Sequence, residues 1–300
     1  MSSVFSGQYF NSIGNYLKDR FGCKVIKLSL DAGFTCPNRD GSKGTGGCIF
    51  CSAEGSGDFA SDIPGQIRLL SNKWPSGKYI AYFQSHTNTY APVEVLREKY
   101  DQALRYPGVI GVAIATRPDC LSPEVLELLS ELNKKTFLWV ELGLQTIHEE
   151  TARTINRCYE LSVFDQAIEN LTARNIKTVV HLILGLPGES PEDMAASVRY
   201  VCAKGVFGIK LHLLNVLKDT RLAEFYPHRL HIPEKEEYIN LVVDLLEIIP
   251  QNITIHRVTA DAPRHLLIAP EWSYEKRSIL NGIQKEFRRR GSFQGKRLTE

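Results

Sequence analysis

The sequence lacks the features that would place it among membrane or secreted proteins. No apolar run approaches the roughly 20 residues that a helix needs to span a bilayer. The N-terminal stretch MSSVFSGQYF has no basic region followed by an apolar run, so it does not resemble a signal peptide. Net charge is small, +2 over 300 residues, and indicates no particular partner. We therefore expect a cytoplasmic protein whose seven cysteines stay reduced and available to metal rather than forming disulfides.

The composition fits an ordinary globular protein. Hydrophobic residues make up 43% of the chain and charged residues 23%. A chain of 300 residues is long enough for one large domain or two small ones, with a substantial core.

Three of the cysteines lie in one polar, glycine-rich stretch, DAGFTCPNRDGSKGTGGCIFCSAE at residues 31–54. Cys36, Cys48 and Cys51 are spaced C-x11-C-x2-C. The residues between Cys36 and Cys48 have almost no side chain able to form a core, so apolar packing cannot hold this loop in shape. A metal or cluster bound by three thiolates would hold it, and would keep one coordination position open for a small molecule.

Two other interpretations of the cysteines remain open. A structural zinc site would need a fourth ligand, a distant His or Cys. The three cysteines could also be unrelated buried residues, although the charged and glycine-rich surroundings argue against that.

Short apolar runs alternate with helical patterns along the chain. Phe5, Tyr9, Ile13 and Leu17 recur every four residues and predict an N-terminal amphipathic helix. The predicted strands span residues 24–30, 79–84, 109–115, 137–145, 178–184, 207–216 and 253–258. The predicted helices span residues 92–106, 123–133, 151–174 with a break near Tyr159, 191–204, 233–249 and 275–290. This order predicts an α/β fold with parallel strands, either a barrel or an open doubly wound sheet.

Polar residues gather where several predicted strands end. These runs are Gln84 to His86, Thr116 to Asp119, Glu141 to Gln145, and Gly185 to Glu189. The carboxyl ends of the strands form the active site in βα-barrels, so this placement favours a barrel with its site at that edge.

The motif KLSLDAGFTCPNRDG followed by GGCIFCSAEGSGDF resembles the cluster loop of radical S-adenosylmethionine (SAM) enzymes, in particular the YhcC/YtqA-like branch related to the Elongator catalytic subunit. The first gap of eleven residues departs from the three that are usual in that superfamily. The resemblance implies that Cys36, Cys48 and Cys51 hold one 4Fe–4S cluster and that SAM chelates the fourth iron. Reductive cleavage of SAM would then give a 5′-deoxyadenosyl radical.

The resemblance also implies a fold. It is a partial (β/α)6 TIM-like barrel with an N-terminal helix and a C-terminal α/β extension. We expect a radical SAM core at residues 1–232 and an extension with a basic tail at residues 233–300.

Several positions match SAM-binding positions of the family. They are Phe50, Ser85, Glu141, Gln145, Arg157, His181, Gly185 and Gly188. The Gly-Gly-Glu motif that contacts the SAM amino group in relatives is absent, and Ser85 or Thr87 would replace it. Lys210 and His212 alternate with apolar neighbours on a predicted strand and are candidate substrate contacts.

The C-terminal segment is basic, with nine Lys or Arg against four Glu from Arg264 onward. Arg288, Arg289 and Arg290 stand near aromatic residues, a combination that suits an RNA backbone and its bases. Those aromatic residues are Trp272, Tyr274, Phe287 and Phe293. A basic helix that merely packs on the core is the alternative.

The resemblance implies a tRNA substrate, modified at a wobble uridine, and an electron donor such as flavodoxin or ferredoxin. It implies no membrane partner. A radical SAM enzyme acting on a small metabolite or a protein, and a zinc-stabilised RNA-binding module without catalysis, are the other function classes.

Overall fold

The computed structural model describes residues 8–55, 57–71 and 77–298. The chain divides into two compact units. Unit 1 contains Met1–Tyr16, Gln145–Asn156 and Val180–Glu300, and unit 2 contains Leu17–Leu144 and Arg157–Val179.

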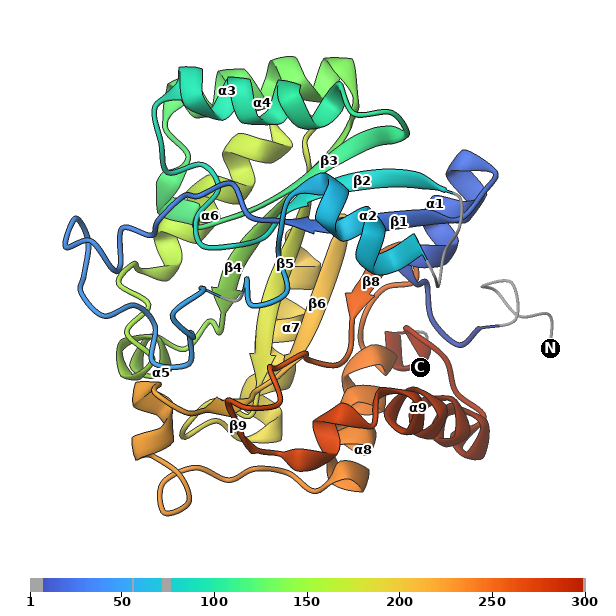
Figure 1. Cartoon of the computed structure of the whole chain (residues 1–300). Helices are drawn as coiled ribbons and strands as arrows, with labels where there is room; N and C mark the ends of the chain where they lie inside the picture. The colour runs from blue at the N-terminus through green and yellow to red at the C-terminus, as the bar shows by residue number, and fades with distance from the viewer. Residues whose placement is uncertain (1–7, 56, 72–76, 299–300) are drawn as a thin grey trace. The chain divides into compact units, whose positions relative to one another are not determined.

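One sheet of seven strands runs through the fold in the order β1-β2-β3-β4-β5-β6-β8 (Figure 1). Its strands are β1 (Val25–Leu30), β2 (Lys78–Phe83), β3 (Val109–Thr116), β4 (Phe137–Gln145), β5 (Lys177–Leu184), β6 (Gly208–Leu213) and β8 (Thr254–Arg257). The pairs β1–β2, β2–β3, β3–β4 and β6–β8 are parallel. Parallel neighbours need crossover segments, and helices supply them in most of the chain.

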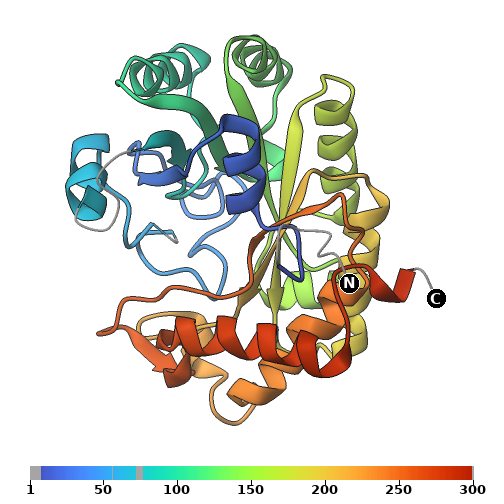
Figure 2. The same ribbon diagram turned by 90° about the vertical axis from the view of Figure 1, so that its right-hand side faces the viewer.

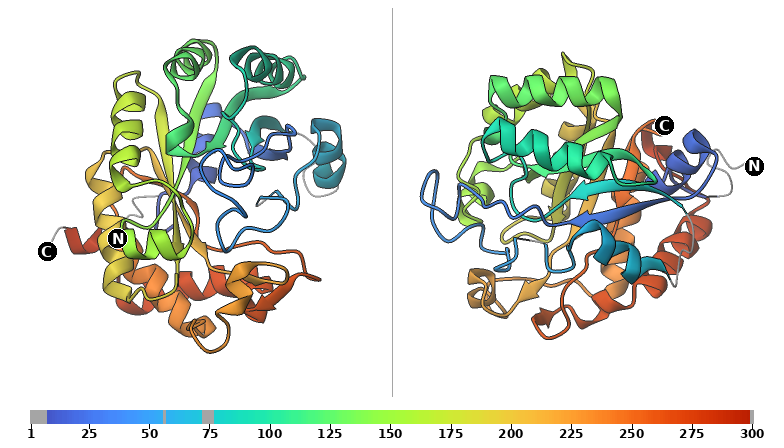
Figure 3. Two further views of the ribbon diagram at one scale, coloured as in Figure 1. Left: turned by 90° about the vertical axis from the view of Figure 1, so that its left-hand side faces the viewer. Right: turned by 45° about the horizontal axis from the view of Figure 1, so that its top comes forward.

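In unit 2, helices α3 (Val93–Leu104) and α4 (Pro123–Lys135) lie side by side, and α3 packs on β3 (Figures 1 and 3). Ser122 caps α4, because its side chain accepts a hydrogen bond from the N–H of Val125. The other helices of this unit are α2 (Ile63–Ser71) and α6 (Leu161–Thr172), with the 3-10 turn η1 (Pro118–Cys120). Helix α1 (Ile13–Phe21) begins in unit 1 and continues into unit 2.

In unit 1, helices α8 (Lys235–Glu247) and α9 (Lys276–Arg290) pack against each other (Figure 2). The unit also has α5 (Glu149–Thr154), α7 (Pro191–Ala203) and the 3-10 turns η2 (Arg221–Glu224), η3 (Glu271–Tyr274) and η4 (Lys296–Leu298). A capping box of Ser190 and Asp193 starts α7. Strands β7 (Val216–Leu217) and β9 (Leu267–Ala269) form a separate antiparallel pair.

Most of the predicted elements are present, and the differences are few. Helix α1 begins at Ile13, so Tyr9 precedes it, and Phe5 lies outside the described residues. The strand predicted at residues 207–216 ends at Leu213, and Val216 pairs in β7 instead. Helix α2 and strand β9 were not predicted. Every helix in the described ranges is too short or too polar to cross a bilayer.

Candidate metal centre

The cysteine loop follows β1 in unit 2 and is built on backbone turns. The Cys36 carbonyl accepts a hydrogen bond from the N–H of Arg39 at 2.8 Å, and the Cys48 carbonyl accepts one from the N–H of Cys51 at 3.1 Å. All three cysteines are free thiols. The Cys51 thiol hydrogen-bonds to Cys48 and, together with burial, raises the pKa of Cys48 well above its usual value. The two thiols of the C-x2-C pair therefore lie together.

Arg39 bridges the two ends of the loop. Its guanidinium donates hydrogen bonds to the carbonyl of Ala53, at 3.1 Å, and to the carbonyl of Ser52. Gly47 lies against this side chain at φ +74°, where a Cβ would come within 3.1 Å of Arg39 Nε. Asn38 is fully buried and its amide donates to Cys48 Sγ at 3.6 Å. Hydrogen bonds therefore hold the loop in the place of apolar packing.

Backbone hydrogen bonds tie the polar segment after β2 to the cysteine loop and to the residue that follows it. Thr87 N–H donates to the Thr35 carbonyl, next to Cys36, and His86 N–H donates to the Gly55 carbonyl, both at 3.2 Å. Ser85 is only 2% exposed, and within the described residues its hydroxyl has no hydrogen-bond partner. A buried polar atom of this kind is usually satisfied by water or a ligand.

A group of charged and aromatic side chains packs in the same unit. Arg117 binds both carboxylate oxygens of Asp119 at 2.9 Å and donates to the carbonyl of Arg157 at 3.0 Å. Arg157 is 1% exposed and donates to the carbonyls of Tyr159 and Leu144. The Tyr159 ring contacts both guanidinium groups, at 5.1 Å from Arg117 and 4.5 Å from Arg157. We call Arg117, Asp119, Arg157 and Tyr159 the arginine stack.

Glu141 and Phe50 complete the predicted residues of unit 2. Glu141 is fully buried in β4 and accepts a hydrogen bond from the Trp139 indole at 2.8 Å, which supplies the polar partner expected for a buried carboxylate. Phe50 lies half-buried between Cys48 and Cys51 in the loop.

The remaining predicted cofactor positions belong to unit 1. Gln145 ends β4 with φ 68°. His181 on β5 lies beside His212 on β6, with ring centroids 4.9 Å apart. Gly185 and Gly188 have φ values of 88° and 83°, so any other residue there would be strained. Lys210 is buried in the same unit.

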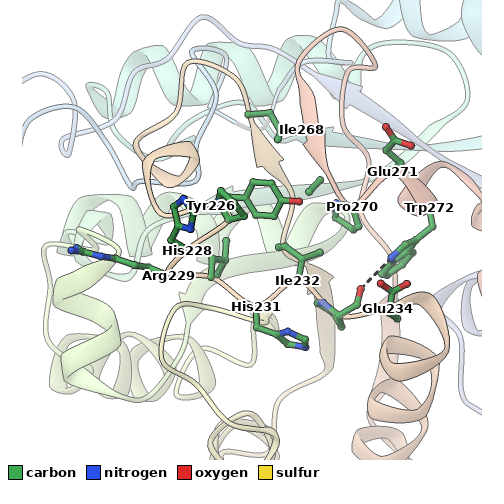
Figure 4. A pocket seen from close by; sticks show the side chains of 14 residues that line it. Tyr226, His228, Arg229, His231, Ile232, Glu234, Ile268, Pro270, Glu271 and Trp272 are labelled. Carbon is green, nitrogen blue, oxygen red and sulfur yellow. Dashed lines mark hydrogen bonds between the residues drawn. The ribbon is translucent and has the colours of Figure 1, made fainter.

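The described structure has a pocket beside each of these regions. In unit 2, a pocket of about 1000 Å³ is lined by Pro37, Lys43, Tyr90 and Cys120, among others. In unit 1, a pocket of about 500 Å³ lies between the Gly185–Glu189 turn and α8. A second pocket of unit 1, of about 790 Å³, is lined by Tyr226 and Trp272 (Figure 4). The Trp272 indole in it donates to the Pro233 carbonyl at 3.1 Å.

Two of the three tail arginines form ion pairs within the protein. Arg290 contacts Asp244 at 2.6 Å and Glu286 at 2.6 Å, and Arg289 also contacts Glu286. Arg288 is exposed. The expectation that Phe287 stacks on RNA bases is wrong, because the side chain is fully buried and stacks on Tyr9 at 5.5 Å.

Sequence reasoning missed Arg39, Asn38 and the Arg117–Asp119 pair. The only sequence signal for the Arg117–Asp119 pair is the polar run Thr116 to Asp119 at the end of a predicted strand. That run does not predict that the two charges are buried and paired. Cys158 was also missed. Its sulfur lies against Gly44 of the cysteine loop, only 2.8 Å from where a Cβ on that glycine would stand. Among the described residues, no three His, Cys, Asp or Glu side chains converge as the ligands of one metal ion do.

Comparison with known proteins connects these features to a family. Residues 39–201 match the radical SAM superfamily and residues 206–289 match the radical SAM C-terminal domain. YtqA of Bacillus subtilis is 47% identical over 296 residues, which cover 96% of this chain and 92% of that protein. YhcC of Escherichia coli is 38% identical over 271 residues, 87% of each chain. The tRNA uridine(34) acetyltransferase of Dehalococcoides mccartyi is 27% identical over 158 residues, 51% of this chain and 34% of that protein.

Among the solved structures that share the fold are an Elp3 and a coproporphyrinogen III oxidase. Elp3 of Methanocaldococcus infernus has a TM-score of 0.66 at 17% identity over 90% of this chain, which spans only 64% of the Elp3 chain. Coproporphyrinogen III oxidase (HemN) of Escherichia coli has a TM-score of 0.50 at 15% identity, over 74% of this chain and 51% of that chain. Together with the βα strand order, these matches confirm the predicted α/β fold of radical SAM type, and the YtqA and YhcC relatives confirm the predicted branch.

Proposed function

Because this chain belongs to the radical SAM superfamily, we propose that it is an enzyme whose Cys36, Cys48 and Cys51 hold a 4Fe–4S cluster. When bound, the cluster supplies the electron that cleaves SAM to methionine and a 5′-deoxyadenosyl radical, which takes a hydrogen atom from the substrate. The observation that carries this proposal is the loop itself, three free thiols on one hydrogen-bonded backbone in a chain of this family.

The donor set fits such a cluster. Four-iron clusters take one thiolate per iron, so three cysteines leave one iron for SAM. The loop is braced by Arg39 and by the Thr87–Thr35 hydrogen bond, and neither contact depends on a metal. The chain's own part is to carry the three thiols on one braced loop that the cofactor can join.

The proposed SAM contacts follow from the chemistry of each residue. In unit 2, Ser85 offers a buried hydroxyl to the SAM ammonium group, and Phe50 offers a ring for the adenine. Glu141 and Arg157 are the other proposed contacts there; a guanidinium suits a two-point contact with the SAM carboxylate.

In unit 1, the Gly185 to Gly188 turn exposes backbone that a nucleoside can approach closely, because a Cβ at either glycine would meet no atom within 4 Å. Gln145 and His181 are the remaining proposed SAM contacts. Lys210 and His212 are the proposed substrate contacts.

We propose tRNA as the substrate, with a wobble uridine as the modified nucleoside. A tRNA uridine(34) acetyltransferase and Elongator proteins are among the relatives, which supports this choice. Arg288 is the proposed phosphate contact on α9, with Arg289 and Arg290 beside it, and Arg290 also ties α9 to Asp244 of α8. The proposal includes a flavodoxin or ferredoxin as electron donor, a cytoplasmic location, and a division into a core at residues 1–232 and an extension at residues 233–300.

Anaerobic reconstitution tests the cofactor. Purified protein should be brown, bind about four iron atoms per chain, and release 5′-deoxyadenosine from SAM when a chemical reductant is added. Cys36→Ala, Cys48→Ala and Cys51→Ala should each abolish this release, whereas Cys202→Ala, outside the loop, should not. A colourless, zinc-containing protein would instead support the non-catalytic RNA-binding class.

Mass spectrometry of tRNA nucleosides tests the substrate. Cells lacking the gene should lose one modified uridine at the wobble position and regain it when the wild-type gene is restored. An unchanged nucleoside profile in cells whose wild-type protein cleaves SAM would remove tRNA and leave a metabolite or a protein as substrate.

A further inference from the structure

Arg117 is a fixed positive charge inside unit 2. Its side chain is 9% exposed. Three of its nitrogen atoms donate hydrogen bonds, two to the Asp119 carboxylate and one to the Arg157 carbonyl. Its guanidinium also lies over the Tyr159 ring. An arginine remains protonated at every ordinary pH, so these contacts hold one full charge at a defined place.

The arginine stack abuts the cysteine loop through Cys158. A Cβ built on Gly44 would lie 2.8 Å from Cys158 Sγ and 2.3 Å from Asn38 Oδ1, so Cys158 and Asn38 meet at Gly44. Asn38 in turn donates to Cys48 Sγ at 3.6 Å. Arg117 therefore binds the backbone of Arg157, and the next residue, Cys158, touches the cysteine loop.

Arg117 keeps its charge inside the fold. Burial lowers the pKa of Arg117, but the hydrogen bond and the charge of Asp119 raise it above its usual value. At Cys158, whose pKa is raised mainly by burial, the Arg117 charge outweighs that of Asp119.

We propose that Arg117 and Asp119 form a charge pair that sets the reduction potential of the cluster on Cys36, Cys48 and Cys51, with Arg117 raising it and Asp119 lowering it. This inference rests on the proposed function. Reduction adds one electron to the cluster, and a fixed cation nearby stabilises the more negative state. Net charge and hydrogen bonding around a cluster are established determinants of its potential. Arg117 acts on the cluster through the electric field of its charge. It is therefore a positioning residue and not a catalytic one.

A redox titration of the reconstituted protein, followed by electron paramagnetic resonance of the reduced cluster, tests the pair. Arg117→Gln should lower the equilibrium constant for reduction about tenfold, which corresponds to about 59 mV toward negative potential for one electron. Asp119→Asn should shift the potential in the opposite direction. Arg117→Lys keeps the charge and should stay nearer to wild type than Arg117→Gln.

Two further variants separate charge from folding. Arg97→Gln removes an arginine that pairs with Glu131 at the surface between α3 and α4, and it should leave the potential unchanged. The double variant Arg117→Gln/Asp119→Asn removes both buried charges and should fall between the single variants. Arg117→Gln leaves Asp119 buried without its cation. If that variant takes up no cluster, the direction in which Asp119→Asn shifts the reduction potential decides whether the proposal stands.

Shifts of opposite sign in the two single variants support the proposal. Shifts of the same sign, as a loosened loop would produce in both, overturn it, as do unmoved potentials. A wild-type protein that takes up no iron would overturn the proposed function, and this inference with it.

Discussion

Arg39 reaches across the cysteine loop to Ala53, with 3.1 Å between Nη1 and the carbonyl oxygen. The arginine follows Cys36 by three residues and Ala53 follows Cys51 by two, so this contact joins the two ends of the loop that carry the proposed sulfur ligands. The geometry of the loop is thereby set by a side chain that is not itself a ligand.

Arg39→Ala should reduce cluster uptake without unfolding the protein. The variant loses two charge-assisted hydrogen bonds to carbonyls, each worth roughly 1.5–3 kcal/mol at most, and the loop is then free to splay. Iron content after anaerobic reconstitution should fall clearly below wild type. Lys43→Ala, which removes an exposed cation from the same loop, is the matched control and should bind iron normally. Equal iron content in both variants would refute the bridging role of Arg39.

Glu286 should make stability depend on pH in acid. The hydrogen bond from Arg289 is the main cause that lowers the pKa of this carboxyl from 4.5 to about 2; burial, second in size, raises the pKa, and the hydrogen bond from Arg290 lowers it again. Because the folded pKa lies below the unfolded one, the stabilisation is present above pH 4.5 and is lost as the pH falls toward 2. The side chain is 12% exposed, and we expect about 1 kcal/mol after solvent screening.

Urea unfolding of Glu286→Gln and wild type at several pH values measures this contribution. The difference in unfolding free energy should be largest near pH 7 and should shrink below pH 4. A constant difference over that range would show that the carboxyl charge contributes nothing and that only packing was changed.

Phe287→Ala should be among the most destabilising substitutions in α9. The ring is fully buried and stacks on Tyr9, so its removal leaves a cavity that costs about 3–5 kcal/mol. Leu280→Ala on the same helix removes a side chain that is 42% exposed and should cost less than about 0.5 kcal/mol. Chemical denaturation of the two variants gives both values, and similar losses would place Phe287 outside the core.

Arg288→Ala and Arg290→Ala should separate RNA binding from folding. Arg288 is exposed, so its loss should weaken tRNA binding and reduce the slope of log affinity against log salt by about 1, with an unchanged melting temperature. Arg290 holds Asp244 and Glu286, so its loss should lower the melting temperature. Filter binding over a salt series measures the first effect, with Arg199→Ala on α7 as control. An Arg288→Ala protein with wild-type affinity and salt slope would exclude it from the RNA contact.

The sequence was most informative where structure depends on local pattern. Strand β4 has the bounds that its apolar run predicted, and the break near Tyr159 separates α5 from α6. Helix α2 was missed because Pro64 and Gly65 stand in its first turn and hide the helical pattern. Strands β7 and β9 are very short and lie some 50 residues apart, so only the tertiary structure defines them.

The site was predictable only for residue types that carry chemistry in themselves. Three cysteines in a glycine-rich loop indicate metal from sequence alone. The spacing of Glu286 and Arg290 allows an i,i+4 ion pair on the helix. The fold selects the other partners, which are Asp244 for Arg290 and backbone carbonyls for Arg39 and Arg117. Phe287 shows the same limit, since an aromatic residue beside arginines reads equally as an RNA contact or as core.

The order of the seven strands follows their order along the chain, from β1 to β6 and then β8. A nascent polypeptide leaving the ribosome can therefore add each strand to an edge that already exists, and no early strand has to wait for a partner made much later. Since the cysteine loop comes directly after the first strand, its three thiols emerge early in synthesis, before most of the strands of the sheet exist.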